Sequence, residues 1–241
     1  MSQETDTSHK KKILLKLTGE LFLSRTTGQL APDAAQSLIS QLKPLLTTHQ
    51  FGIVVGGGNF FRGSQQGAIM GIRPAVGHQI GMLSTMMNGL MLKDLFDQAN
   101  INTALFCAMP AAEIGKPIAQ QTITDAIKAD QLMIFTGGTG NPFFTTDTTA
   151  ILRALQMGAQ EVWKGTTVDG VYSADPRTNP AAQKLTTLDF AWAIKNNLGI
   201  MDITAYAMAQ RYGITVRVFD LFADHALEQV AHNKIFGSTI S

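Results

Sequence analysis

Short apolar segments alternate with helical patterns along most of the chain, and this alternation restricts the fold more than any other feature of the sequence. The apolar segments, which we expect to be strands, fall at 12–17, 51–55, 102–107, 131–135, 161–164 and 215–220. The helical patterns fall at 31–42, 76–98, 122–130, 147–157, 188–196, 202–212 and 223–232. Strands joined through helices in this way run parallel and connect by right-handed crossovers. The sequence therefore predicts a largely parallel sheet with helices on both faces, which binds ligands at the carboxyl ends of its strands.

The length of the chain suits one large domain. Its 241 residues, of which 45% are hydrophobic, are enough for a sizeable core, and no repeat, low-complexity tract or Pro/Ser-rich linker divides them. We expect a flexible N-terminal tail at 1–11 and a single domain with two lobes at 12–241.

Charge and cysteine content exclude several classes of function. The 19 basic and 18 acidic residues nearly cancel, so we expect neither a nucleic-acid surface nor a polybasic membrane anchor. The single cysteine, Cys107, cannot form an internal disulfide or a cysteine-based zinc site, and the five histidines lack metal-ligand spacing, so no catalytic metal held by protein side chains is expected. Because no signal peptide and no apolar run of about 18 residues occurs, the expected location is cytoplasmic.

Four of the expected strands end in sequences suited to phosphate. These are KLTGE at 16–20, VVGGGNFFRG at 54–63, TGGTGNPFFTTD at 136–147 and KGTTVDGVYSADP at 164–176. Glycines let the backbone approach a ligand closely, Lys16 and Arg62 can reach anionic oxygens, and the helix after the third stretch offers further donors. Since the carboxyl ends of parallel strands share one edge of a sheet, the four stretches should meet there.

Each stretch also has a plain structural interpretation. A glycine cluster alone is more often a tight turn than a phosphate site, Lys16 could lie on the surface, and Arg62 could pair with a neighbouring carboxylate. We expect Asp147 to be the N-cap of the helix at 147–157, and VDGVY at 168–172 to be a turn between two short strands. Neither the P-loop pattern nor G-x-G-x-x-G occurs, which excludes those two nucleotide-binding classes.

The expected helix at 76–98 carries a stripe of methionines. Its members are Met82, Met86, Met87 and Met91, in pairs about one helical turn apart. Such a stripe is most often part of the core or of a subunit contact, and we interpret it in that way.

Several motifs together resemble those of the bacterial UMP kinases, which belong to the amino-acid kinase superfamily. The motifs are KLTGE, GGGNFFRG, GMLSTMMN in the helix at 76–98, GTGNPFFTTD, VDGVYSADP and IMD at 200–202. They follow one another from about residue 12 to the C-terminus, and GTGNPFFTTD with VDGVYSADP is specific to this family within the superfamily. The resemblance implies a three-layer α/β/α sandwich of the carbamate kinase-like fold and transfer of the γ-phosphoryl group of ATP to UMP with Mg²⁺, in pyrimidine nucleotide biosynthesis. It also implies a homohexamer and UTP as a feedback inhibitor.

The resemblance further implies which residues form the site, with Lys16 and Arg62 at catalytic positions. The residues expected to bind ATP are Lys16, Leu17, Thr18, Gly19, Gly58, Arg62, Thr166, Tyr172 and Asp175. The residues expected to bind UMP are Gly57, His78, Thr139, Gly140, Asn141, Pro142, Phe143, Phe144, Thr145 and Thr146. No protein ligand for Mg²⁺ is expected, because nucleotide phosphates and water can hold the ion. The resemblance implies that the N-terminal lobe binds the acceptor and the C-terminal lobe binds ATP.

A transfer of this kind needs no general base. The attacking group is a phosphate oxygen that is mostly ionised at neutral pH, since the second pKa of a phosphate monoester is about 6. The difficulty is to bring two polyanions into line, so positioning and charge stabilisation should supply most of the catalysis. A site with lysine, arginine and backbone amides but no Ser-His or Cys-His pair meets that requirement.

The sequence departs from the family pattern at three places. His78 stands where the family usually has an aspartate that takes the ribose hydroxyls, Thr167 replaces a common lysine, and the loop at 23–32 differs from the acidic loop linked to GTP activation. Neutral His78 could accept one ribose hydrogen bond and lose it on protonation in mildly acidic solution, or it could be a solvated residue at the helix start. The altered loop leaves activation by GTP open.

Two other functions stay open on the sequence alone. A kinase of the same superfamily acting on carbamate or an N-acylated amino acid would keep the nucleotide half of the site, but retention of NPFFTT favours UMP. A non-catalytic nucleotide sensor or storage protein would keep the scaffold without the chemistry, and Lys16, Arg62 and Asp175 argue against it.

Overall fold

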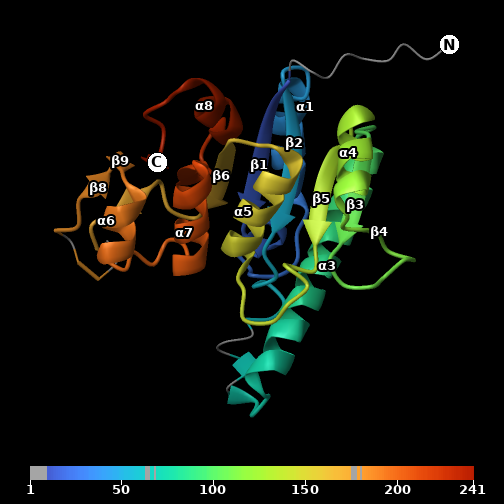
Figure 1. Ribbon diagram of the computed structural model, residues 1–241, viewed down its shortest axis with the longest axis horizontal. Helices are drawn as coiled ribbons and strands as arrows, with labels where there is room; N and C mark the ends of the chain where they lie inside the picture. Colours follow the sequence, from blue (N-terminus) through green and yellow to red (C-terminus); the bar gives the residue numbers. More distant parts are fainter. Residues whose placement is uncertain (1–9, 63–65, 68, 175–177, 180) are drawn as a thin grey trace.

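A nine-stranded sheet forms the centre of the protein (Figure 1) in a computed structural model that describes residues 10–62, 66–67, 69–174, 178–179 and 181–241. Its strands are β1 (Lys11–Leu17), β2 (His49–Val55), β3 (Thr103–Cys107), β4 (Lys116–Pro117), β5 (Leu132–Thr136), β6 (Glu161–Thr166), β9 (Thr187–Leu188), β10 (Thr215–Asp220) and β11 (Ser238–Ile240). They lie in the order β4-β3-β5-β2-β1-β6-β10-β11-β9. Of these neighbours only β10 and β11 pair antiparallel, which confirms the largely parallel sheet.

Helices cover both faces of this sheet. Those on one face are α4 (Gln120–Lys128), α5 (Thr146–Met157), α6 (Phe190–Lys195) and α7 (Ile203–Tyr212), and those on the other are α1 (Asp33–Leu45), α3 (Pro74–Gln98), α8 (Ala226–His232) and the 3-10 helix η2 (Gly19–Phe22). Alternate side chains of each strand enter opposite layers: Leu14 packs in the layer with α5 and α7, and Ile13 and Leu15 pack in the layer with α1 and α8. The fold is therefore the expected three-layer α/β/α sandwich.

The expected elements all occur, with ends within about three residues of the observed ones. The short strands β4, β9 and β11 were not expected, because two or three residues are too few to show a periodic pattern. Residues 167–170 bend between β6 and the next strand, as expected for VDGVY, but the two strands that flank this bend lie in separate sheets. β7 (Val171–Tyr172) pairs antiparallel with β8 (Lys184–Leu185) in a separate two-stranded sheet, whereas β6 pairs with β1 and β10.

The four phosphate-suited stretches follow strands that are direct neighbours in the sheet. These strands are β5, β2, β1 and β6, in that order, and all of them run parallel. Their carboxyl ends therefore lie side by side at one edge, as the sequence predicted. In Figure 1 the long helix α3 extends past the sheet at the bottom of the view.

The N-terminal boundary and the methionine stripe differ in detail from expectation. β1 begins at Lys11, and the ammonium group of Lys10 lies 2.5 Å from the Asp130 carboxylate, so both lysines are held by the domain although we placed them in the tail. Residues 1–9 lie outside the described part. Met82 and Met86 are buried, whereas Met87 is half exposed, so the stripe divides between core and surface. In the part of the chain that the structure describes, no helix has the length and apolar character needed to span a membrane.

Candidate active site

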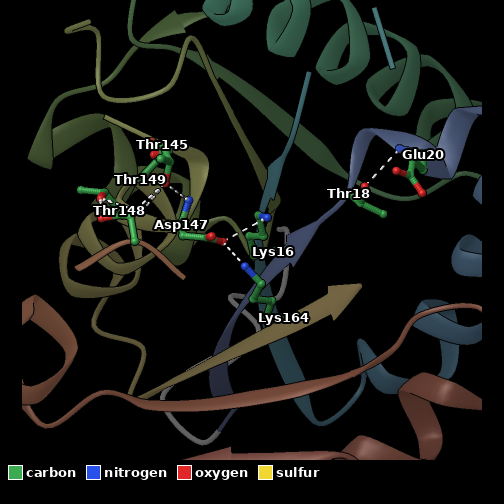
Figure 2. Close-up of polar contacts among 9 residues, drawn as sticks. Lys16, Thr18, Glu20, Thr145, Asp147, Thr148, Thr149 and Lys164 are labelled. Atoms are coloured by element: carbon green, nitrogen blue, oxygen red, sulfur yellow. Dashed lines mark hydrogen bonds and ion pairs between the residues drawn. The ribbon is translucent and has the colours of Figure 1, made fainter. Parts of the chain in front are cut away.

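One carboxylate lies between two lysines at the edge where the strands end. Lys16 in β1 and Lys164 in β6 are direct partners in the register of the parallel pair. Asp147, in the first turn of α5, faces both of them: its Oδ1 atom is 3.0 Å from the Nζ atom of Lys16 and 2.6 Å from that of Lys164. Figure 2 shows both ammonium groups directed at this carboxylate. All three side chains are largely buried, so the charges act on one another with little screening by solvent.

The charges of this cluster set its protonation state. Burial by itself would raise the pKa of Asp147, but Lys16 and Lys164 outweigh that effect and lower it to about 2. Burial, followed by repulsion from Lys16, lowers the pKa of Lys164 to about 8, although Asp147 opposes the shift. At neutral pH the cluster therefore has two positive charges against one negative charge, and the excess can be balanced by an anion.

The expectation that Asp147 is the N-cap of its helix was wrong. The N-cap is Thr145, whose Oγ1 atom accepts hydrogen bonds from the backbone N–H groups of Asp147 at 3.0 Å and Thr148 at 3.5 Å. The backbone of Thr145 is extended, with φ −93° and ψ 173°, as an N-cap requires, and the helix begins at Thr146. The Asp147 side chain is thus free to face the lysines.

Asp202, the last residue of the IMD motif, holds the start of α5 against α7. It accepts hydrogen bonds from the hydroxyl groups of Thr145 and of Thr148, the latter at 2.8 Å. It is also the N-cap of α7, because its Oδ1 atom accepts from the Ala205 backbone N–H at 2.9 Å. The IMD motif was one of those that resemble the family, but no role was predicted for Asp202.

A cavity of about 380 Å³ opens beside the start of α5. It brings together six residues that the sequence predicted for the site, namely Gly57, Arg62, His78, Phe144, Thr145 and Thr146. The remaining lining residues, which were not predicted, are Phe61, Gly77, Gly81, Met82, Thr85 and Gly138. None of the lining side chains is a carboxylate, and Arg62 supplies a positive charge. The cavity suits a ligand that carries an anionic group and a flat apolar part.

The loop between β5 and α5 has an unusual backbone. Gly137, Gly138 and Gly140 have φ values of 74°, 60° and 83°, and Phe143, which has a side chain, has φ 72°. A bulky residue with positive φ is strained, so surrounding contacts must hold it there. The Phe143 ring is 66% exposed, and its centroid lies 5.1 Å from that of His78. This pair joins the loop to the start of α3.

Not every predicted acceptor residue lies in this cavity. Thr139 and Asn141 form a local turn, in which the Asn141 backbone N–H donates to Thr139 Oγ1 at 3.2 Å. Thr139 instead lines a neighbouring hollow of about 610 Å³ together with Arg153.

The residues predicted for ATP lie along the same edge but are spread more widely. Leu17 has a fully buried side chain and can offer a ligand only its backbone. Thr18 caps η2 by accepting from the Glu20 backbone N–H at 3.3 Å (Figure 2). Arg62 is exposed and pairs with Glu20 at 3.1 Å, which is the alternative partner that the sequence left open.

The other residues predicted to bind ATP follow β6. Thr166 ends that strand, and its carbonyl accepts from the Leu221 backbone N–H at 2.9 Å. The hydroxyl of Tyr172 donates to Asp169 at 2.8 Å, and this bond raises the pKa of Tyr172. Asp175 lies outside the described residues. Gly19 is the first residue of η2, and Gly58 lies in the loop after β2.

Lys164 was not among the residues predicted for the site. It is the last residue of the apolar run EVWK, just as Lys16 comes near the end of KILLKL, and that parallel was the available signal. Among the residues that the structure describes, no group of three or more His, Cys, Asp or Glu side chains could hold a metal ion.

Known proteins resemble this chain over nearly its whole length. The model of the amino acid kinase family matches residues 11–220. A uridylate kinase of Mycoplasma pneumoniae is 41% identical over 218 residues, which are 90% of this chain and 92% of that protein, and one of Colwellia psychrerythraea is 38% identical over 96% of this chain and 94% of that protein.

Solved structures that superpose on this fold are UMP kinases as well. The crystal structure of UMP kinase from Ureaplasma parvum superposes with a TM-score of 0.90 at 31% identity and covers 96% of this chain and 99% of that one. The UMP kinase of Bacillus anthracis superposes with the same TM-score at 26% identity, over 96% of each chain. The chain belongs to the amino acid kinase family.

Proposed function

We propose that the protein is a UMP kinase, which transfers the γ-phosphoryl group of ATP to UMP and forms ADP and UDP. The observation that carries this proposal is the Lys16–Asp147–Lys164 cluster at the strand ends, beside a cavity lined by Arg62 and the predicted acceptor residues. The relatives and solved structures that resemble the chain over most of its length are uridylate and UMP kinases.

The cluster provides charge stabilisation and no proton transfer. The phosphate oxygen of UMP is already ionised at neutral pH and can attack without a general base. Negative charge on the transferred group is stabilised by the ammonium groups of Lys16 and Lys164, which the protein fixes before the substrates arrive. Asp147 holds these two like charges on adjacent strands in place, since without it they would repel each other.

The acceptor and donor occupy opposite sides of the cluster in this proposal. UMP lies in the cavity with its phosphate near Gly57 and Arg62 and its base against Phe144, Thr145 and Thr146. ATP lies toward Gly19, Gly58, Thr166 and Tyr172. The N-terminal part of the single domain at 12–241 then binds the acceptor and the C-terminal part binds ATP.

His78 is one of the three places where this chain departs from the family pattern, and it lines the cavity. We assign it one hydrogen bond to the UMP ribose. Loss of this hydrogen bond in His78→Ala should raise the Michaelis constant for UMP more than that for ATP. An unchanged Michaelis constant for UMP in that variant would exclude this role.

Mg²⁺ enters with ATP in this proposal. The residues fit an ion held by nucleotide phosphates and water, because the Asp147 carboxylate already faces two ammonium groups and the described residues contain no cluster of metal ligands. The ion would reduce the charge repulsion between the two substrates.

UTP, which shares the uridine of UMP, is proposed as a feedback inhibitor. The use of ATP and UMP suggests a cytoplasmic location.

We further propose that the protein is a homohexamer. The support is an apolar stripe on α3, formed by Leu83, Met87 and Leu90, each of which is about half exposed. These residues lie one turn apart on one face of the helix, where a second copy could cover them.

ADP formation from ATP and Mg²⁺ tests the function, with UMP, CMP, dUMP, carbamate and N-acetylglutamate compared as acceptors. We expect turnover with UMP, a weaker reaction with dUMP, and none with the last two. Turnover with carbamate or N-acetylglutamate would establish the alternative kinases, and binding of UMP without turnover would establish a sensor.

A further inference from the structure

Asn88 in α3 is a fully buried polar residue to which the proposed mechanism gives no role. Its Nδ2 atom donates to the carbonyl of Gly56 at 2.6 Å. It also exchanges two hydrogen bonds with Asn59: the Nδ2 atom of Asn88 donates to Oδ1 of Asn59 at 2.7 Å, and the reverse bond is 3.0 Å. A buried amide with this many good partners fixes the groups around it.

Asn59 in turn packs against the loop that follows β1. A Cβ atom at Gly19 would lie only 2.3 Å from Asn59 Oδ1 and 2.8 Å from the Gly56 carbonyl oxygen, so the two loops touch at this glycine. The Gly56 backbone N–H also donates to the Leu17 carbonyl at 2.9 Å. The Asn88–Asn59 pair therefore supports both the loop after β1 and the loop after β2.

The same helix supports the third loop of the site. The Gly137 backbone N–H donates to Thr85 Oγ1 at 2.9 Å, one turn of α3 before Asn88. A Cβ atom on Gly57 would lie 2.9 Å from the Gly81 carbonyl oxygen and 3.0 Å from the Thr85 backbone nitrogen, so this loop lies directly on α3. α3 is thus a common support for the loops after β1, β2 and β5.

We propose that Asn88 is a positioning residue for phosphoryl transfer, which fixes the distance between the ATP-binding segment at Gly19 and the acceptor-binding segment at Gly56 and Gly57. This inference rests on the proposed function, in which ATP lies near Gly19 and UMP near Gly57. Loss of the Asn88 bonds lets the two loops move independently, so each nucleotide still binds but the two are no longer in line. Reacting groups displaced by about 1 Å can lose on the order of 10²-fold in rate.

The test compares Asn88→Ala and Asn59→Ala with the control Ser84→Ala. Ser84 is also buried and lies one turn earlier on α3, but among the described residues its hydroxyl bonds only to the Ile80 carbonyl of the same helix. We expect Asn88→Ala to lower kcat by about 10- to 100-fold, with the dissociation constants of ATP and of UMP changed by less than about threefold. Ser84→Ala should keep the kcat of the original protein. Asn59→Ala should act in the same direction as Asn88→Ala, and the double variant should be no worse than Asn88→Ala, because both changes remove one joint interaction.

A ligand that joins adenosine and uridine through a pentaphosphate chain gives a readout that does not depend on turnover. Because it spans both loops, its affinity for Asn88→Ala should fall by about 10-fold or more, while the affinities for ATP and UMP alone are kept. The variant Asn88→Asp offers a second check, because its buried carboxyl group can donate to the Gly56 carbonyl only when it is protonated. Its kcat should therefore rise as the pH falls from 8 to 6, and that of Asn88→Ala should not.

Three results would overturn the inference. They are an unchanged kcat in Asn88→Ala, an equal loss of kcat in Ser84→Ala, and an equal loss of affinity for single and joined nucleotides. Thermal unfolding of each variant ensures that folded proteins are compared. If Asn88→Ala does not fold, Asn59→Ala replaces it as the test variant, because Asn59 is only half buried. Failure of the proposed function would show differently, as the absence of UMP turnover in the original protein.

Discussion

At the scale of single residues, the site depends on two lysines that are register partners on adjacent strands and share one carboxylate oxygen. Two ammonium groups this close are unfavourable without Asp147, and they become favourable when a phosphoryl group with several negative oxygens lies against them. The cluster is thus prepared for its ligand at a cost in the stability of the free protein.

The lysines should be needed for turnover more than for folding. We expect Lys16→Ala and Lys164→Met each to lower kcat by about 10²- to 10³-fold, as is typical when one fixed electrostatic donor is lost. Steady-state kinetics with ATP and UMP measures this effect, and circular dichroism confirms the fold. Near-normal turnover in either variant would remove that lysine from the mechanism.

The pH dependence of the reaction should report Lys164. Burial and the neighbouring Lys16 lower its pKa to about 8, so in the free protein its ammonium group loses its proton as the pH rises through about 8. We expect kcat/KM for ATP to fall above that pH, since this parameter reflects groups of the free enzyme. The profile of Lys164→Met should lack this decline, and an unchanged decline in that variant would assign it to another group.

Asp147 should contribute to stability with a defined pH dependence. Its pKa in the folded protein, about 2, lies below the ordinary value of 3.8, so its contribution is complete above pH 3.8 and is lost as the pH falls toward 2. At neutral pH, Asp147→Asn leaves two adjacent lysines without a counter-charge and should lower the unfolding free energy by about 3 kcal/mol. Denaturant titrations at pH 7 and pH 2.5 would measure this, and the difference between the two proteins should shrink at the lower pH.

The residues of the site were only partly predictable. Lys16, Arg62 and the 139–146 segment could be found because they stand next to glycines at strand ends. The pairing of Asp147 with Lys164 could not be found, since it requires the register of β1 against β6 and the position of α5 above them. The local sequence indicated an N-cap role for Asp147, but in the structure its side chain contacts two lysines instead.

At the scale of elements, the start of α5 is held by α7 through Asp202. This contact fixes Thr145, which lines the proposed acceptor cavity, and indirectly Asp147, two residues further on. We expect Asp202→Ala to remove the N-cap of α7 at a cost of about 1 kcal/mol in stability and to raise the Michaelis constant for UMP more than that for ATP. A change in stability without a change in either Michaelis constant would make Asp202 purely structural.

The long elements were predictable and the short ones were not. Strands such as β1 and β10 are apolar runs buried on both faces, and α5 and α7 end at Gly158 and Gly213, which have positive φ, so local chemistry and tertiary structure agree. β7 and β8 are two residues each and form only because residues 171–172 and 184–185 meet across a long loop. No local pattern could reveal that pairing.

At the scale of the whole molecule, the exposed apolar stripe of α3 should be covered by another copy. Leu83→Glu and Met87→Glu each place a charge in that contact, so we expect smaller assemblies in sedimentation experiments. Gln210→Glu, an exposed change on α7 at the opposite face of the sheet, is the matched control. A monomeric original protein would contradict the hexamer.

The central claim is that one molecule of ATP and one of UMP react at the Lys16–Asp147–Lys164 cluster. ³¹P NMR of ATP, UMP and Mg²⁺ with the purified protein tests it most directly, because it identifies both products. We predict that UDP and ADP appear in equal amounts with the original protein and more than about 10²-fold more slowly with Lys16→Ala. Formation of ADP with inorganic phosphate in place of UDP, or equal rates in the two proteins, would contradict the claim.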